Sequence, residues 1–181
     1  MANNTKIRYT DIPQYIGLES SKLTLHLSDF KRIIEKFTEE DGLNLSPDFQ
    51  RDYVWTDVQK SRYIEHLLKG GKTGITLIFN YPGWNKGESG GMEVIDGKQR
   101  ISAILDFLNN KITAFGYFYR DFKGQIPLRY YVEYVIVDFK SRVDVLKLYL
   151  QLNEAGTPHT EAELTKVRKL LVEEETKNSH D

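Results

Sequence analysis

The chain has 181 residues, of which 40% are hydrophobic; its formal net charge is −1, and it contains no cysteine. This length suits one domain, and the hydrophobic content is enough to bury a core and too high for a disordered chain. The composition excludes disulfides and thiolate metal sites, and it disfavours binding to polyanions through bulk charge. No apolar run reaches the ~20 residues of a membrane helix, and the N-terminus lacks an apolar signal-peptide segment, so we expect a cytoplasmic protein with no membrane partner.

The first predicted element is an amphipathic helix at residues 28–40. Its apolar side chains recur on one helical face, and an Asp-Gly pair at residues 41–42 ends it. We expect Ser28 to be the N-cap residue. The following segment, residues 43–51, is expected to be extended, and Pro47 favours an edge or a bend there.

A second helix is predicted at residues 56–68, because a capping-box pattern precedes an apolar stripe. Residues 75–81 are rich in β-branched and aromatic side chains, which is typical of a strand, and residues 92–95 predict a short partner strand. The intervening residues, 82–91, have the composition of a loop. A glycine-rich phosphate cradle is the alternative, but the spacing matches no phosphate loop, so we favour a hairpin loop.

The remaining elements are predicted in the following order: a helix at 98–110, a strand at 130–137, a helix at 141–152 and a helix that begins at Thr160. Residues 141–152 fit a period of two about as well as a helical period, and we choose a helix on its length and on Ser141 as an N-cap candidate. Helices and strands follow one another in mixed order, which indicates the α+β class. We expect one domain over residues 1–172 and a disordered acidic tail over residues 173–181.

Asp96-Gly97-Lys98-Gln99-Arg100 lies where a predicted strand meets a predicted helix. One interpretation is a helix cap, with Asp96 as the N-cap and Gln99 reaching back to it. That interpretation explains neither the glycine nor the two cations, which the helix dipole disfavours in a first turn. The other interpretation is an anion site at a helix N-terminus, where Asp96 holds a metal ion or positions a water. A nucleotide phosphate bound with Mg²⁺ would account for both the basic residues and the carboxylate of Asp96. The residues alone do not decide between the helix cap and the anion site.

Two further clusters have functional and structural interpretations. Within residues 47–55, Gln50 and Arg51 form a polar pair that could bind phosphate or a base edge, because an Arg fork suits phosphate. The alternative is a strand edge whose apolar neighbours lie in the core. Asn153 would point inward from a helix end, and the alternative is an ordinary helix C-terminus followed by Gly156.

Four stretches taken in order carry a family resemblance: "PDFQRDYVW", "IEHLLKG", "VIDGKQRISAILDFL" and "LYLQLNEAGTPHTEAEL". Together they resemble the N-terminal domain of GmrSD-type restriction endonucleases, of the ParB/sulfiredoxin-like superfamily, over about residues 45–164. The central motif of that family is usually Asp-Gly-Gln-Gln-Arg, and Lys98 stands here in place of the first Gln. The resemblance implies an α+β, ParB-like domain with a small mixed sheet flanked by helices.

The resemblance also implies a stand-alone domain that binds nucleotide or DNA phosphate. We expect it to hydrolyse NTP with Mg²⁺, acting on or sensing DNA in a restriction, defence or phage context. A C-terminal nuclease domain is not expected in this chain, so a separate nuclease or other partner subunit is expected, and a homodimer is a further expectation. The alternatives are a non-catalytic DNA- or protein-binding module and a DNA nickase. The expected catalytic residues are Asp96, Gln99 and Arg100, with Asp96 also as the metal ligand, and the expected phosphate-binding residues are Gln50, Arg51, Gly97, Lys98 and Asn153.

Overall fold

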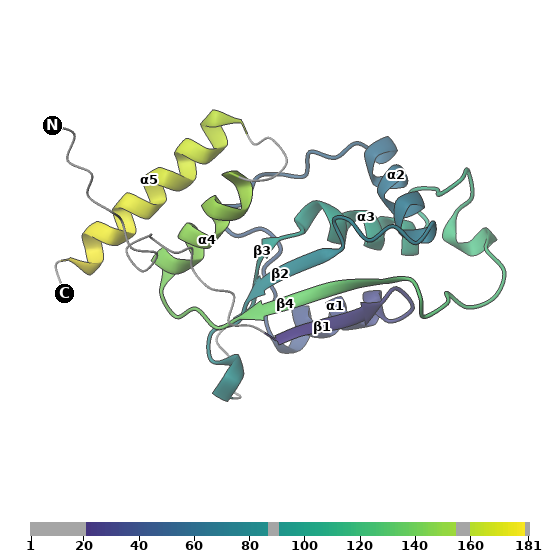
Figure 1. The fold of residues 1–181 in the computed structure, drawn as a ribbon, viewed down its shortest axis with the longest axis horizontal. Helices are drawn as coiled ribbons and strands as arrows, with labels where there is room; N and C mark the ends of the chain where they lie inside the picture. Colours follow the sequence, from purple (N-terminus) through teal and green to yellow (C-terminus); the bar gives the residue numbers. More distant parts are fainter. Residues whose placement is uncertain (1–20, 87–90, 155–159, 180–181) are drawn as a thin grey trace, which may run out of the picture.

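A computed structural model of the chain describes residues 21–86, 91–154 and 160–179. A four-stranded sheet has the strand order β1-β4-β2-β3, in which β4 is parallel to β2 and the other two pairings are antiparallel. The mixed sheet and its helices confirm the predicted α+β class (Figure 1). The strands are β1 (Ser21–His26), β2 (Thr76–Asn80), β3 (Glu93–Asp96) and β4 (Tyr131–Val137).

The helices are α1 (Phe30–Glu40), α2 (Asp57–Leu68), α3 (Lys98–Leu108), α4 (Arg142–Glu154) and α5 (Glu161–Asn178). Capping boxes begin α2 at Thr56 and α5 at Thr160, as predicted. The segment with ambiguous periodicity is helical in α4. In Figure 1, α4 and α5 lie at one end of the sheet, and α2 with α3 lies toward the other.

The strands β2 and β3 are buried on both faces of the sheet. Along β2, Leu77 and Phe79 face the core that α1, α2 and α3 cover, whereas Ile78 faces the core that α4 and α5 cover. Val94 and Ile95 of β3 divide between the two cores in the same way. This alternation follows from the two-residue period of a strand, and it places the end of β3 between helices of both layers.

Several sequence predictions differ from the structure in the N-terminal half. Strand β1 was not predicted, because an edge strand of mixed polarity gives a weak signal. The N-cap of α1 is Asp29 rather than Ser28. Residues 43–51 do not form a continuous extended segment. Asn44 makes one isolated β-bridge, to Glu93. The chain then turns, and the backbone N–H of Gln50 donates to the Pro47 carbonyl at 2.9 Å. A proline at the start of such a turn is the bend that the sequence allowed.

Two further predictions concern the loop at 82–91 and the C-terminus. Within the loop, a short 3₁₀ helix occupies Trp84–Lys86, and residues 87–90 lie outside the described residues. The acidic residues from 173 onward were predicted to be disordered, but α5 continues as far as Asn178. Lys147 of α4 pairs with Glu175 at 2.8 Å, which links this end of α5 to the domain.

Candidate functional site

The junction between β3 and α3 depends on Gly97. This residue is the N-cap of α3 and has a φ of 113°, a conformation that L side chains rarely adopt. A Cβ atom at this position would lie 2.5 Å from Leu77 Cδ2, so a side chain here would force the fully buried Leu77 of the neighbouring strand to shift. No side chain caps the helix. The structure therefore contradicts the capping interpretation, in which Asp96 was the N-cap, and no side chain of the N-cap residue satisfies the first-turn amides of α3.

Gln99 ties α3 to the segment that precedes α2. Its side-chain oxygen accepts hydrogen bonds from the backbone N–H of Val54 at 3.1 Å and of Trp55 at 3.2 Å. Its side-chain nitrogen donates to the Asp52 carbonyl at 2.8 Å. Gln99 is only 8% exposed, so these hydrogen bonds satisfy a side-chain amide that water reaches poorly. The side chain thus fixes one wall of the site instead of reaching back to its own helix terminus.

Lys98 binds the same segment from the first position of α3. Its ammonium donates to the Arg51 carbonyl at 2.7 Å and lies 4.6 Å from the centre of the Tyr53 ring. Burial lowers the pKa of this ammonium below its usual value, and the nearby Asp52 carboxylate opposes that effect. One of the three ammonium donors is therefore used to hold the wall.

Gln50 orders the end of β3 from the other side. Its side-chain nitrogen donates to the Val94 carbonyl at 3.1 Å and to the Ile95 carbonyl at 2.7 Å. These carbonyls directly precede Asp96 in the chain. Gln50 therefore fixes the backbone from which Asp96 projects.

Asp96 and Arg100 form an ion pair one helical turn apart. The Asp96 side chain is 41% exposed, whereas that of Arg100 is 17% exposed. The Nε atom of Arg100 is buried and has no hydrogen-bond partner among the described residues. A buried guanidinium donor without a partner is costly, so it marks a position where an acceptor on a ligand would be stabilising.

Asn153 enters the site from the last turn of α4, as expected. Its side-chain nitrogen donates to the Tyr149 carbonyl at 2.6 Å. Burial raises the pKa of the Tyr149 phenol to about 12, so this group stays neutral at ordinary pH. Gly156, which the sequence paired with Asn153, lies outside the described residues.

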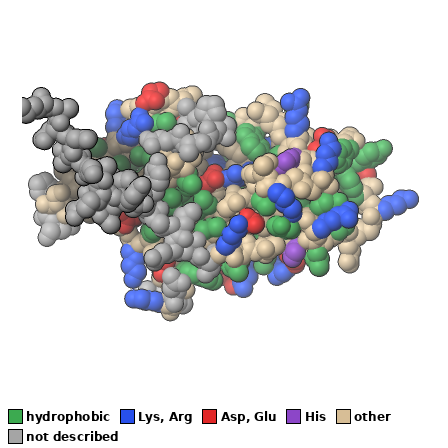
Figure 2. Space-filling view, viewed as in Figure 1, with side chains coloured by type: hydrophobic (Ala, Val, Ile, Leu, Met, Phe, Trp, Pro, Cys, Tyr) green, Lys and Arg blue, Asp and Glu red, His purple; other side chains and the backbone are tan. Residues whose placement is uncertain are grey.

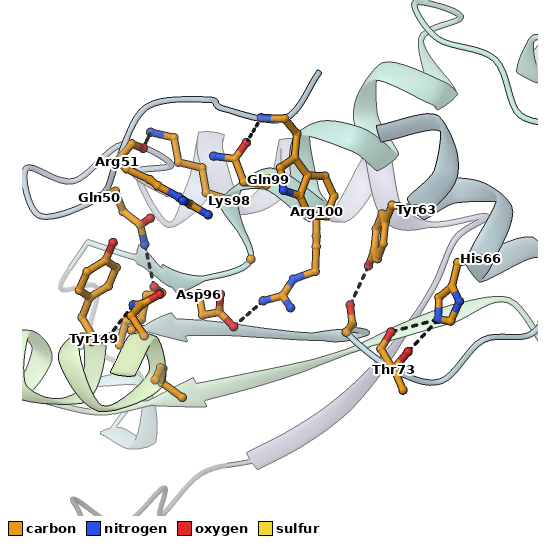
Figure 3. A pocket seen from close by; sticks show the side chains of 16 residues that line it. Gln50, Arg51, Tyr63, His66, Thr73, Asp96, Lys98, Gln99, Arg100 and Tyr149 are labelled. Carbon is orange, nitrogen blue, oxygen red and sulfur yellow. Dashed lines mark hydrogen bonds and ion pairs between the residues drawn. The ribbon is translucent and has the colours of Figure 1, made fainter. Parts of the chain in front are cut away.

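All these groups line one cavity of about 420 Å³, shown in Figure 3. The structure brings together every expected site residue: Gln50, Arg51, Asp96, Gly97, Lys98, Gln99, Arg100 and Asn153. Figure 3 shows the Arg51 side chain extending toward Lys98, on the side of the cavity opposite Tyr63 and His66. The volume falls within the range of small-molecule sites.

Sequence reasoning missed one wall of the cavity, which α2 and the following loop supply. Tyr63 donates from its hydroxyl to the Gly74 carbonyl at 3.0 Å, and burial raises the pKa of that hydroxyl. His66 Nε2 lies 3.1 Å from the Thr73 hydroxyl. Trp55 packs edge-on against Tyr63, with ring centres 5.4 Å apart. Tyr63 and His66 are three residues apart and share a helical face, which is the signal that could have indicated them.

The arrangement favours an anionic ligand. Two guanidinium groups, an ammonium and a helix N-terminus surround the cavity, and among the described residues Asp96 is the one carboxylate on its wall. Among the described residues, no group of three or more His, Asp or Glu side chains is placed so that the protein by itself could hold a metal ion. Mg²⁺ is commonly bound by one or two carboxylates together with substrate phosphates and water, so Asp96 fits Mg²⁺ if phosphate supplies the other ligands.

No helix among the described residues has both the length and the apolar character needed to cross a membrane.

Comparison with known proteins identifies the family to which the chain belongs. Neither the curated proteins nor the solved structures include a significant match to the chain. The family model of the GmrSD restriction endonuclease N-terminal domain matches residues 30–126, just over half of the chain. This match includes the segments around Arg51 and Arg100, begins earlier than the resemblance at residue 45, and ends before Asn153. The four-stranded mixed sheet is consistent with the ParB-like fold of that domain, and the chain belongs to the GmrSD restriction endonuclease N-terminal domain family.

Proposed function

We propose that the protein binds the phosphate groups of a nucleoside triphosphate in the cavity of about 420 Å³ at the N-terminus of α3, called the α3 cavity below. We propose that it hydrolyses the triphosphate there with Mg²⁺, as part of a system that acts on or senses DNA. Family membership implies a restriction or defence context. The observation that carries the proposal is the convergence of Arg51, Arg100 and the uncapped N-terminus of α3 on one cavity. Three separated segments supply these groups and Asn153, and guanidinium groups and helix N-termini each bind phosphate in their own right.

The cations Arg51, Arg100 and Lys98 would each bind different phosphate oxygens. Arg51 can offer a planar fork to two phosphate oxygens, and Arg100 can offer the buried Nε donor that lacks a partner among the described residues. Lys98 keeps two donors after binding the Arg51 carbonyl. A phosphate that binds Arg100 would compete with Asp96 for the guanidinium, which frees the carboxylate.

Asp96 would be the protein ligand of Mg²⁺, or would orient the attacking water. When bound, the ion neutralises charge on the phosphate oxygens. Gln50 would keep Asp96 in place by fixing the two preceding carbonyls. Asn153 would order the opposite side of the cavity through its hydrogen bond to the Tyr149 carbonyl.

Phosphate release, measured with each of the four NTPs and Mg²⁺, tests the proposal. We expect Asp96→Ala and Arg100→Ala to lower turnover by about 10²–10³-fold, the usual effect of removing one group that stabilises developing charge. Arg32→Ala is the matched control, because Arg32 lies on the exposed face of α1 and pairs with Asp29. If no NTP is turned over and none shifts the thermal unfolding of the wild type, the proposal is wrong.

A non-catalytic binding module is the second candidate, and one observation favours it. Lys98 and Gln99 hold the segment at 51–55, so part of the motif maintains the cavity wall. If Arg51→Ala weakens retention of nucleotide or DNA while turnover is absent throughout, the binding module replaces the hydrolase. Relaxation of supercoiled plasmid under the same conditions tests the nickase alternative.

A further inference from the structure

The segment between α3 and β4 lies at the end of the molecule next to α2 (Figure 1). It carries exposed aromatic side chains. The residues Phe115, Tyr117 and Phe122 are 43%, 60% and 39% exposed. Tyr117 and Phe122 pack edge-on, with ring centres 6.4 Å apart. Phe115 and Phe122 border a hollow of about 290 Å³ that is separate from the α3 cavity. Exposed rings gathered in this way usually mark a binding surface.

Basic side chains lie beside the rings of this segment and beside Tyr130, which borders the same hollow. The Lys69 ammonium lies 5.3 Å from the centre of the Phe115 ring, and the Arg129 guanidinium lies 4.9 Å from that of Tyr130. Lys123 lines the same hollow. Figure 2 shows Lys and Arg side chains next to hydrophobic ones at this end of the molecule. Within the described part of the chain, none of these three cations is paired with a carboxylate, so their charges are available to a ligand.

The neighbouring acidic groups are engaged with the backbone. Glu65 accepts a hydrogen bond from the Phe115 N–H at 2.8 Å, and Asp121 accepts one from the Phe118 N–H at 2.9 Å. Both carboxylates thus hold the shape of the segment. Lys69, Lys123 and Arg129 give this region three cations against the two carboxylates of Glu65 and Asp121, whereas the whole chain has a net charge of −1. A local excess of cations beside exposed rings complements a ligand that carries both anionic groups and flat apolar faces.

We infer that an aromatic–basic surface, made by Lys69, Phe115, Tyr117, Phe122, Lys123 and Arg129, binds single-stranded DNA. Bases that are not paired can stack on the exposed rings, while the cations contact the phosphates. A duplex hides the faces of its bases and would use only the cations. This surface is separate from the proposed NTP site, and its binding would give a restriction-family domain a contact with unpaired DNA.

Fluorescence anisotropy with a labelled oligo(dT) of about 12 nucleotides tests this inference, because aromatic–basic grooves commonly cover about 4–16 nucleotides. We expect Tyr117→Leu to weaken binding roughly tenfold, since it removes a stacking ring and keeps an apolar side chain. Tyr117 is 60% exposed, so the fold should not depend on it. We expect Lys69→Gln and Arg129→Gln each to reduce the slope of log affinity against log salt by about 0.7.

Lys36→Gln is the matched charge control, because the Lys36 side chain is 52% exposed on α1 and does not line the hollow. The inference is overturned if Tyr117→Leu binds oligo(dT) as the wild type does, or if duplex DNA of the same length binds as tightly. Tighter binding of oligo(U) would overturn the assignment to DNA. Tyr117→Leu should keep any thermal shift that NTP produces, so a failure of this surface is distinguishable from a failure of the proposed NTP site.

Discussion

Replacement of Gly97 by alanine should destabilise the fold strongly, because it would strain the backbone and would also crowd Leu77 on the adjacent strand. An L residue at a φ of 113° is strained, which costs about 1–3 kcal/mol. The new Cβ would lie 2.5 Å from Leu77 Cδ2 and 3.4 Å from Leu77 Cα, and relief of such overpacking typically costs about 1–3 kcal/mol. The free energy of unfolding should therefore fall by about 2–6 kcal/mol.

Urea denaturation followed by circular dichroism measures this loss. With a urea slope of about 2 kcal/mol per molar, the midpoint should fall by about 1–3 M without a change in slope. Gly42→Ala is the matched control, because Gly42 also has a positive φ, of 64°, but a Cβ added there would have free space around it to a distance of 4 Å. That control should lose only about 1–2 kcal/mol. If Gly97→Ala costs no more than Gly42→Ala, the close approach of β2 to this glycine is not what requires it.

Three further outcomes are expected. Gln99→Ala should lower the free energy of unfolding by about 2–4 kcal/mol, because it removes three partly buried hydrogen bonds worth about 0.5–1.5 kcal/mol each. Hydrogen exchange at the Val54 and Trp55 amides should accelerate, and unchanged exchange would contradict this role. Gln50→Leu should leave two carbonyls of β3 without their donor and cost about 1–3 kcal/mol in the same denaturation assay. Because burial raises the pKa of Tyr149 to about 12, the unfolded state loses this proton first, so stability should fall as pH rises from about 10 toward 12. Tyr149→Phe should remove that part of the pH dependence, and equal slopes in the two proteins would contradict it.

The sequence alone determined the features that depend on neighbours in the chain. The capping boxes at Thr56 and Thr160 begin helices as predicted, because their hydrogen bonds span only three residues. The strands β2, β3 and β4 lie within one residue of their predicted bounds, since each combines β-branched side chains with turn residues at its ends. The clusters around Arg51, Arg100 and Asn153 were also recognised from residue types and order.

Only the tertiary structure decided what those clusters contact. The partners of Gln50 and Gln99 lie 44–47 residues away, so the sequence could not show that both amides hold backbone segments in place. The same holds for Gly97, whose need for glycine comes partly from Leu77 on the adjacent strand. Tyr63 and His66 became part of the cavity because α2 packs beside α3. Local hydrogen-bonding patterns can be read along a chain, whereas contacts across the sheet depend on how strands and helices of distant segments pack.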